Sequence, residues 1–447
     1  MPNAIIHAWL QKQFKLQQHQ TNVKREVIAG LTTFAAMSYI LIVNPAILSN
    51  SGMPVAGLIT VTALAACIGT VVMALLTNYP IAMAPGMGLN AFFAFSICLT
   101  RDIPWQAALG IVFWNGILFL LLSVTGIRTK IADAIPDALK IGVQCGIGFF
   151  IAFIGLKNAN LIVANDATFV SLGDLSQPAT LLTLFGIILT LVLVIKKVTG
   201  AILISIMVIT VAGMLVPTSS GMLTQLPNTL VGLPASISDT FFAMDIMYPI
   251  EHFAHTWDLI FALVFVNMFD TIGTLIGVSR KANLLNEQGK LPKFGAAMTA
   301  DASASVVGAS LGTSPVTSYV ESAAGVSSGG RTGLTGLVVA VCFLLALFFT
   351  PLMQAIPVMA TTPALLMVGI LMLDSLKQLD FDDLISLATA AVAMLAMPLT
   401  FSISEGIALG FITYVGMMLG TGRYKQVSAL TYIMAAVFLL RYILDLK

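Results

Sequence analysis

The fourteen residues from 312 to 325, GTSPVTSYVESAAG, interrupt a long apolar region of this chain. They bring a proline, two glycines, several hydroxyl groups and the carboxylate of Glu321 into that region. A charged group at the centre of a bilayer costs at least about 2.5–3.5 kcal/mol on insertion scales. Irregular backbone is tolerated at that depth only where protein buries it or where it lines a cavity. The stretch is therefore expected to line a site inside a membrane protein.

A second interrupted stretch, YPIAMAPGMGLNAFFAF at residues 79–95, has the same character. The two stretches occupy corresponding places in the two halves of the chain. Each combines a short extended piece, at 79–83 and 316–319, with the start of a helix. Paired hydrophobic segments broken by glycine and proline are the best sequence indication of a transporter binding site.

The composition indicates a polytopic membrane protein in contact with membrane lipid. The 447 residues are 58% hydrophobic and only 9% charged, whereas soluble proteins carry about 25% charged residues. A net charge of +1 argues against a nucleic-acid partner. The four cysteines stand singly in apolar segments and are expected to be small core residues.

The apolar segments predict an all-α fold of about 14 membrane spans in two inverted sets of seven. A polar N-terminal segment, 1–26, has no cleavable signal. The first set covers 27–216, the connection 217–257, and the second set 258–420. Residues 421–447 follow, in which 427–445 is either a surface helix or a further span. The predicted spans are 27–46, 57–77, 82–98, 105–124, 139–157, 180–196, 199–216, 258–278, 294–311, 314–330, 333–353, 358–376, 384–401 and 404–420.

The distribution of lysine and arginine orients these spans. With the N-terminus in the cytoplasm, the cytoplasmic loops hold thirteen Lys and Arg residues, and the outside loops hold two, Arg101 and Lys157. This bias follows the positive-inside rule and predicts an extracytoplasmic 217–257 connection. Because seven is odd, the second set runs inverted, which makes the interrupted segments three and ten symmetry mates.

Two carboxylates, Asp270 and Glu321, fall well inside predicted spans, while Asp301 is nearer the end of its span. Intramembrane carboxylates usually face the bundle interior or a wet cavity and serve function. The alternative is a structural carboxylate satisfied by neighbouring helices. Asn267 precedes Asp270 by three residues, so the two are expected on one helix face, together with Thr271 and Thr274.

The helix starts predicted within segments three and ten would leave backbone N–H donors for a polar ligand. Asn90 can both donate to and accept from a heterocycle, and Phe269 and Tyr319 are candidates to stack on a planar one. Small residues such as Gly88 allow close backbone approach.

Other functions fit less well. Glu251, His252 and His255 resemble half of a metal site, but they fall in an outside loop and are expected to be solvated. No predicted span contains histidine, which argues against an intramembrane enzyme, and no metal or cofactor is implied. An ion channel would need a continuous polar stripe along several spans, and an anion exchanger would need a cation at the site.

Four motifs resemble the nucleobase:cation symporter-2 family, in its AzgA-like branch of adenine/guanine/hypoxanthine permeases. They are TFAAMSYILIVNPAIL at 33–48, APGMGLNAFFAF at 84–95, FVNMFDTIGTLIGV at 265–278 and GTSPVTSYVESAAGVSSGGRTG at 312–333. Together with IVAND at 162–166 and SISEGIALGFITY at 402–414, these motifs are most similar to the sequences of bacterial adenine permeases. Many members have aspartate at the position of Asn267.

The resemblance implies a uracil-permease-like fold, in which a core domain (spans 1–4 and 8–11) moves against a gate domain (spans 5–7 and 12–14). It implies proton-coupled purine import through the bacterial inner membrane. It places the binding residues on Asn90, Asp270 and Glu321, with Ser318 and 84–88 nearby.

A neutral base needs a co-transported ion in order to accumulate, and Asp270 or Glu321 is expected to carry the proton. The amide of Asn267 beside an ionised Asp270 leaves acceptors for the 6-amino group of adenine, so adenine is the expected substrate. Hypoxanthine or guanine is the alternative. The sequence is compatible with a homodimer.

Overall fold

The computed structural model describes residues 11–445 except 126–130, 132–133, 219–220, 228, 287 and 289. Residues 1–10 of the predicted N-terminal segment lie outside the described part. The first half of the chain is a succession of apolar helices with two short insertions of strand. Its elements are α2 (Val23–Met37), α3 (Ile40–Leu48), η1 (Ser49–Ser51), α4 (Val55–Thr77), β1 (Met83–Pro85), α5 (Met87–Ala91), η2 (Phe92–Thr100), α6 (Trp105–Thr125), α8 (Asp137–Asn158), β2 (Ile162–Asn165), β3 (Phe169–Leu172), α9 (Pro178–Ile195) and α10 (Ala201–Gly213).

The second half repeats this pattern after a connection that contains a small hairpin. Its elements are β4 (Pro217–Thr218), β5 (Gly221–Met222), α11 (Tyr248–Glu251), α12 (Phe253–Lys281), α13 (Phe294–Leu311), β6 (Val316–Ser318), α14 (Ser322–Ser327), α15 (Gly333–Ala346), η3 (Leu347–Phe349), α16 (Thr350–Gln354), η4 (Val358–Thr361), α17 (Thr362–Met372), η5 (Leu373–Gln378), α18 (Leu384–Thr400), α19 (Ile403–Gly420), η6 (Tyr424–Gln426) and α20 (Ala429–Asp445). The predicted spans coincide with single helices, with a strand and its following helix, or with consecutive helices, as at 27–46, which covers most of α2 and α3. Among the described residues, nine helices are long and apolar enough to cross a membrane.

The two interrupted segments meet in the middle of the fold. Strands β1 and β6 pair antiparallel, with Met83 opposite Ser318, Ala84 opposite Thr317 and Pro85 opposite Val316. The pairing satisfies backbone groups that no water could reach inside a bilayer. The prediction of an extended piece in each segment is confirmed, but its position in the first one was wrong. The strand begins at Met83, the last residue of the expected piece, and includes Ala84 and Pro85.

A helix follows each strand. After β1, the single turn of α5 continues as the π-helical η2, and the Thr100 hydroxyl donates to the Phe95 carbonyl five residues earlier at 2.8 Å. After β6, α14 has only six residues. Glycine lets α14 lie close to α2, because a Cβ on Gly325 would be 2.0 Å from the Thr33 hydroxyl oxygen.

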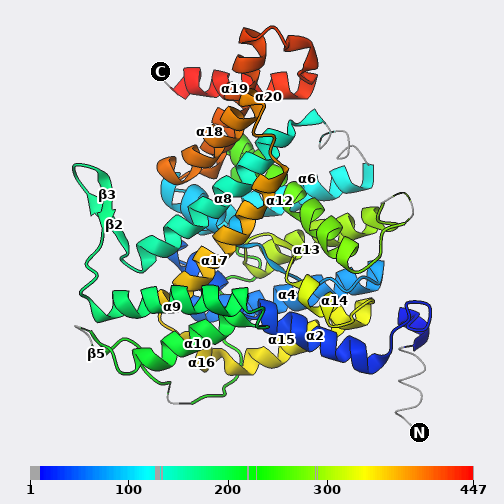
Figure 1. Ribbon diagram of the computed structural model, residues 1–447, viewed down its shortest axis with the longest axis vertical. Coiled ribbons are helices and arrows are strands. Elements are labelled where there is room, and N and C mark those ends of the chain that lie inside the picture. Colours follow the sequence, from blue (N-terminus) through cyan, green and yellow to red (C-terminus); the bar gives the residue numbers. More distant parts are fainter. Residues whose placement is uncertain are drawn as a thin grey trace.

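The ends of the helices define two faces of the bundle (Figure 1). The N-terminal face holds the start of α2, where the Glu26 carboxylate accepts from the backbone of Arg331 and Thr332 at 2.9 and 3.2 Å. The opposite face holds Arg101 and the 217–257 connection, whose Asp245 amide donates to the Gln106 carbonyl at 2.9 Å. The strands β2 and β5 project at this opposite face, away from the start of α2 (Figure 1). The connection is therefore packed onto the helices.

Candidate functional site

The β1–β6 pair is held by the carboxylate of Asp301, a residue that was expected near the end of its span. Asp301 of α13 is fully buried. One of its oxygens accepts from the Ser318 amide and hydroxyl, both at 2.9 Å, and the other accepts from the Thr271 hydroxyl at 2.8 Å. Four partners, counting a long contact from Thr317 at 3.4 Å, tie α12, α13 and β6 together. Asp301 therefore fixes the position of predicted site residue Ser318.

Glu321 lies directly after β6 and is half-buried. Its carboxylate accepts a hydrogen bond of 2.5 Å from the Tyr39 hydroxyl, at the break between α2 and α3. Tyr39 is itself only 1% exposed and was not singled out from the sequence. A signal was available, because Tyr39 stands within the first of the four family motifs.

Asp270 of α12 is also half-buried and makes no hydrogen bond with the described residues. Its charge lies close enough to interact with those of Glu321 and Asp301. The structure thus places Asp270 near Glu321, the first on α12 and the second in the segment after β6, both in the second half of the chain. Val320, between Tyr319 and Glu321, is 53% exposed, so the segment that carries Glu321 reaches the surface of the structure.

Asn90 belongs to α5 and is fully buried. Its amide oxygen accepts from the Ser314 hydroxyl, which links the two interrupted segments. Its Nδ2 has no hydrogen-bond partner among the described residues. Buried donors are normally paired, so this amide has the capacity to bind a further acceptor.

Gly88 precedes Asn90 by two residues and faces α8. A Cβ at Gly88 would lie 2.6 Å from Cγ2 of Ile147, closer than carbon atoms can approach. The expectation that a small residue here permits close approach is therefore supported for a neighbouring helix.

Asn267 does not share the surroundings of Asp270. It is fully buried, and its Nδ2 donates to the Ser305 hydroxyl of α13 at 3.3 Å. Thr271, four residues later, faces the same helix, whereas Asp270 is turned toward the accessible side. The predicted single polar face is thus divided, because a spacing of three residues leaves an angular offset of about 60° around a helix.

The two aromatic candidates, Tyr319 and Phe269, differ in how far their rings are held by other residues. The Tyr319 hydroxyl donates to the Pro85 carbonyl at 2.6 Å, so this ring braces β1 against β6. The Phe269 ring is partly exposed, packs on Phe265 with centroids 4.8 Å apart, and carries the Lys140 ammonium at 5.4 Å. Of the two, Phe269 is the ring available for stacking.

The expectation of free backbone donors at both helix starts was wrong for α14. The amides of Ser322, Ala323 and Ala324 donate to carbonyls three residues earlier, at 2.9–3.2 Å. A tight turn before the helix thus uses the N–H groups that an abrupt start would leave unpaired. Glu321 can therefore contribute its carboxylate to a site, but the start of α14 adds no unpaired backbone N–H groups from residues 322–324.

The two ends of α12 have different surroundings. Toward the opposite face of the bundle, Phe261 and Phe265 pack on Phe411 of α19 with centroids 6.4 and 6.1 Å apart. Toward the N-terminal face, Gly273 and Gly277 are exposed, and a Cβ on either would meet nothing within 4 Å. Asp270 lies between these two parts along the helix, on the side away from Phe261.

The candidate metal ligands and the cysteines do not form a site in the described part of the chain. No group of three His, Cys, Asp or Glu side chains that could hold a metal occurs in the part of the chain that the structure describes. Glu251, His252 and His255 are exposed, but they lie in α11 and the first turn of α12, and so the expected loop is in part helix. The four cysteines are free thiols.

Residues 24–409 match the sequence pattern of a family described as Permease family (Xan_ur_permease). The chain belongs to the xanthine/uracil permease family. This confirms the nucleobase:cation symporter-2 membership indicated by the four motifs. The relatives of this permease are named as transporters and not as enzymes.

Three relatives cover almost the whole permease. Adenine permease AdeP of Escherichia coli K12 is 42% identical over 439 residues, 97% of this chain and 96% of that protein. Guanine/hypoxanthine permease PbuO of Bacillus subtilis 168 is also 42% identical, over 96% of this chain and 99% of that protein. A permease of Methanocaldococcus jannaschii, MJ0326, is 48% identical over 98% of this chain and 99% of that protein.

The fold of the permease is similar to that of the transmembrane domain of a cyanobacterial bicarbonate transporter, BicA. The TM-score is 0.62 at 15% identity, and the match covers 86% of this chain and 96% of that domain. This likeness shows the inverted-repeat fold of a multi-pass membrane protein.

Proposed function

We propose that this permease imports a purine nucleobase together with a proton, with adenine as the preferred substrate. The observation that carries the proposal is the β1–β6 pair of a nucleobase permease, with Asn90 in the helix after β1, Glu321 after β6 and Asp270 near Glu321. We assign Ser318, Gly88, Phe269 and Tyr319 to the same site, with Asn267 one turn before Asp270.

The unpaired Nδ2 of Asn90 supplies a donor for a ring nitrogen or carbonyl of the base. The carboxylates of Asp270 and Glu321 supply acceptors for its N–H groups, and the exposed part of Phe269 offers a stacking surface. Tyr319 and Ser318 hold the backbone on which Glu321 stands, through Pro85 and Asp301.

A proton is the co-transported ion best suited to this site, because its groups near the bundle centre include carboxyls that can gain and lose one. Since Glu321 is bound to Tyr39 and Asp270 has no such partner, Asp270 is the residue we assign to carry the proton. The N-terminal face is then cytoplasmic, in a bacterial inner membrane. A core domain (spans 1–4 and 8–11) moves against a gate domain (spans 5–7 and 12–14), in lipid, in a monomer or a homodimer.

Adenine preference rests on the amide at Asn267 and on an acceptor oxygen of Asp270, which remains when the other oxygen carries the proton. Asn267 reaches Ser305 and not Asp270, so its effect on the base is indirect, through the position of α12. A hypoxanthine or guanine symporter is the second candidate, because PbuO and AdeP are equally identical to this chain.

The test is uptake of radiolabelled adenine, hypoxanthine, guanine and uracil by cells that lack their own permeases. We expect adenine to be taken up best, and uracil least, because a polar site rejects bases that leave its groups unpaired. Asn267→Asp should weaken adenine relative to hypoxanthine in competition, with Asn286→Asp as a control in a loop. Uptake of hypoxanthine or guanine far above adenine would contradict the adenine assignment, and absence of any purine uptake would contradict the function.

A further inference from the structure

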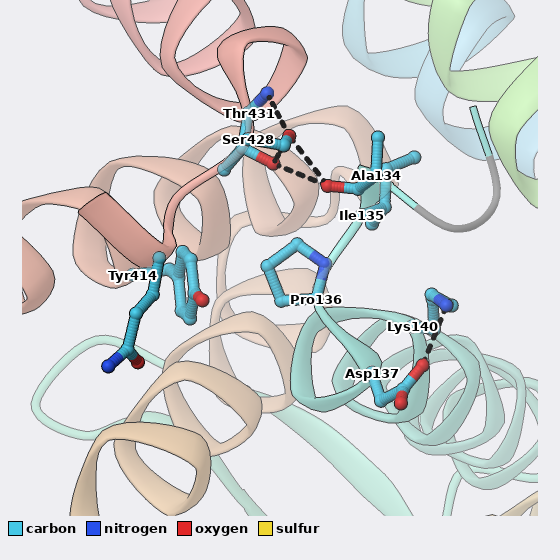
Figure 2. Close-up of a pocket in the computed structure, with 9 residues that line it drawn as sticks. Ala134, Ile135, Pro136, Asp137, Lys140, Tyr414, Ser428 and Thr431 are labelled. Atoms are coloured by element: carbon cyan, nitrogen blue, oxygen red, sulfur yellow. Dashed lines mark hydrogen bonds and ion pairs between the residues drawn. The ribbon is translucent and has the colours of Figure 1, made fainter. Parts of the chain in front are cut away.

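The C-terminal helix α20 runs the full depth of the bundle. At its start, the hydroxyls of Ser428 and Thr431 donate to the Ala134 carbonyl at 2.7 and 2.9 Å, on the N-terminal face (Figure 2). At its other end, Arg441 pairs with Glu405, at the start of α19, at 2.5 Å. Helix α20 is therefore antiparallel to α19, which is itself long and apolar enough to cross a membrane.

The surface of α20 is that of a helix in lipid. Its first twelve residues, ALTYIMAAVFLL, carry no charge. Its exposed side chains include Ile433, Leu439, Leu440 and Ile443, each about half-exposed. A helix lying on a membrane surface would instead present a charged face to water. Seventeen residues span about 26 Å, near the lower limit for a crossing.

Arg441 joins a cluster of four charged side chains on the opposite face. Asp258, at the start of α12, accepts a hydrogen bond from Arg101 at 2.9 Å and forms an ion pair with Arg441 at the same distance, and its side chain is 2% exposed. Glu405 pairs with Arg441 and, at 3.4 Å, with Arg101, and accepts from the Tyr442 hydroxyl. The two carboxylates and two guanidinium groups balance in charge, which makes their burial tolerable.

This cluster of four charged side chains lies at the end of α12 that packs on α19 and α20. The rings of Trp257 and Phe261 on α12 lie 5.5 and 6.0 Å from Phe438 of α20. The exposed Gly273 and Gly277 of α12 lie toward the other end. Along α12, the packed rings therefore lie between Asp270 and the opposite face.

We propose that α20 is a further membrane crossing whose Arg441, with Arg101, Asp258 and Glu405, forms an ion-pair latch on the opposite face. The latch holds α12 and the segment after η2 against α19 and α20 on that face, and the core domain must break it in order to open there. The movement of domains rests on the proposed function, whereas the crossing does not.

The crossing is tested with peptide tags on the intact chain. A tag after Lys447 is expected on the side of the membrane opposite to a tag before Met1 and to a tag inserted at Gly422. Protease accessibility in sealed, right-side-out vesicles reads the three positions. Terminal tags on the same side would overturn the crossing.

The latch is tested by the rate at which an impermeant maleimide, added from the face of Arg101, labels Phe265→Cys. The background has its native cysteines replaced by alanine. Arg441→Gln and Glu405→Gln should each raise the labelling rate about tenfold, and Arg441→Lys should raise it less, because one ion pair can remain. Lys377→Gln, which removes an exposed pair with Asp374, is the matched control and should leave the rate unchanged.

Unchanged labelling in both Arg441→Gln and Glu405→Gln, with the tags still correctly placed, would overturn the latch. Because labelling needs no substrate, a failure of purine transport leaves this result interpretable.

Discussion

At the scale of single residues, the proposed site depends most on Glu321. Its carboxylate is held by Tyr39 and is next to the exposed residue Val320. Glu321→Gln keeps the shape but replaces an acceptor oxygen by a donor, so we expect purine uptake to fall by more than about a hundredfold, with normal membrane insertion. Tyr39→Phe should reduce uptake less, because the carboxylate remains. Glu251→Gln, at an exposed carboxylate, is the control, and wild-type uptake by Glu321→Gln would remove the residue from the site.

Asp301 is predicted to matter for stability as well as for transport. Asp301→Asn places an NH₂ group among the donors of Ser318 and Thr271, so at least one buried donor loses its acceptor. We expect the free energy of unfolding in detergent to fall by about 1–3 kcal/mol. Asp166→Asn, in an exposed turn, should change it by less than about 0.5 kcal/mol. Equal stability of the two variants would show that the network around Asp301 is not a structural support.

At the scale of elements, the contact between α5 and α8 leaves no room at Gly88. Gly88→Val adds three carbon atoms where the first alone would meet Ile147 at 2.6 Å. We expect purine uptake to fall at least about tenfold, since overpacking costs about 1–3 kcal/mol and displaces Asn90. The double variant Gly88→Val with Ile147→Ala should recover part of the activity. Lack of recovery would indicate that Gly88 acts by its backbone conformation.

The start of α18 offers a test of pH dependence outside the spans. The Ser386 hydroxyl and amide donate to Asp383 at 2.7 and 3.0 Å and lower the pKa of its carboxyl group. A lowered pKa means that the stabilisation is present above about pH 4 and is lost as the pH falls through the folded-state value. Asp383→Ala should therefore cost about 1 kcal/mol at neutral pH and less near pH 3, by thermal unfolding. Asp382→Ala is the control, and a cost independent of pH would contradict the capping role.

At the scale of the whole molecule, the sequence was sufficient where a local property decides the structure. Apolar length located the spans, and proline, glycine and β-branched residues located the interrupted segments. The sequence was insufficient where the deciding contact is distant. Asp301 looked peripheral because its burial is set by β6, and the role of Arg441 depends on Arg101, 340 positions earlier.

Part of the arrangement at the candidate site could be predicted, whereas the roles of its residues stay predictions. Asp270, Glu321 and Asn90 were chosen because polar groups inside an apolar span usually serve function. The separate surroundings of Asn267 and the paired amides of α14 were missed, because they follow from helix rotation and turn geometry that periodicity alone does not define.

The measurement that tests the central claim most directly is adenine accumulation in proteoliposomes of the purified permease. An inward proton gradient is imposed in sodium-free buffer. We expect adenine to rise inside well above its outside concentration, to collapse with a protonophore, and to remain at the equilibrium level in Asp270→Asn and Glu321→Gln vesicles. Accumulation that persists after the proton gradient and membrane potential are dissipated would contradict the account.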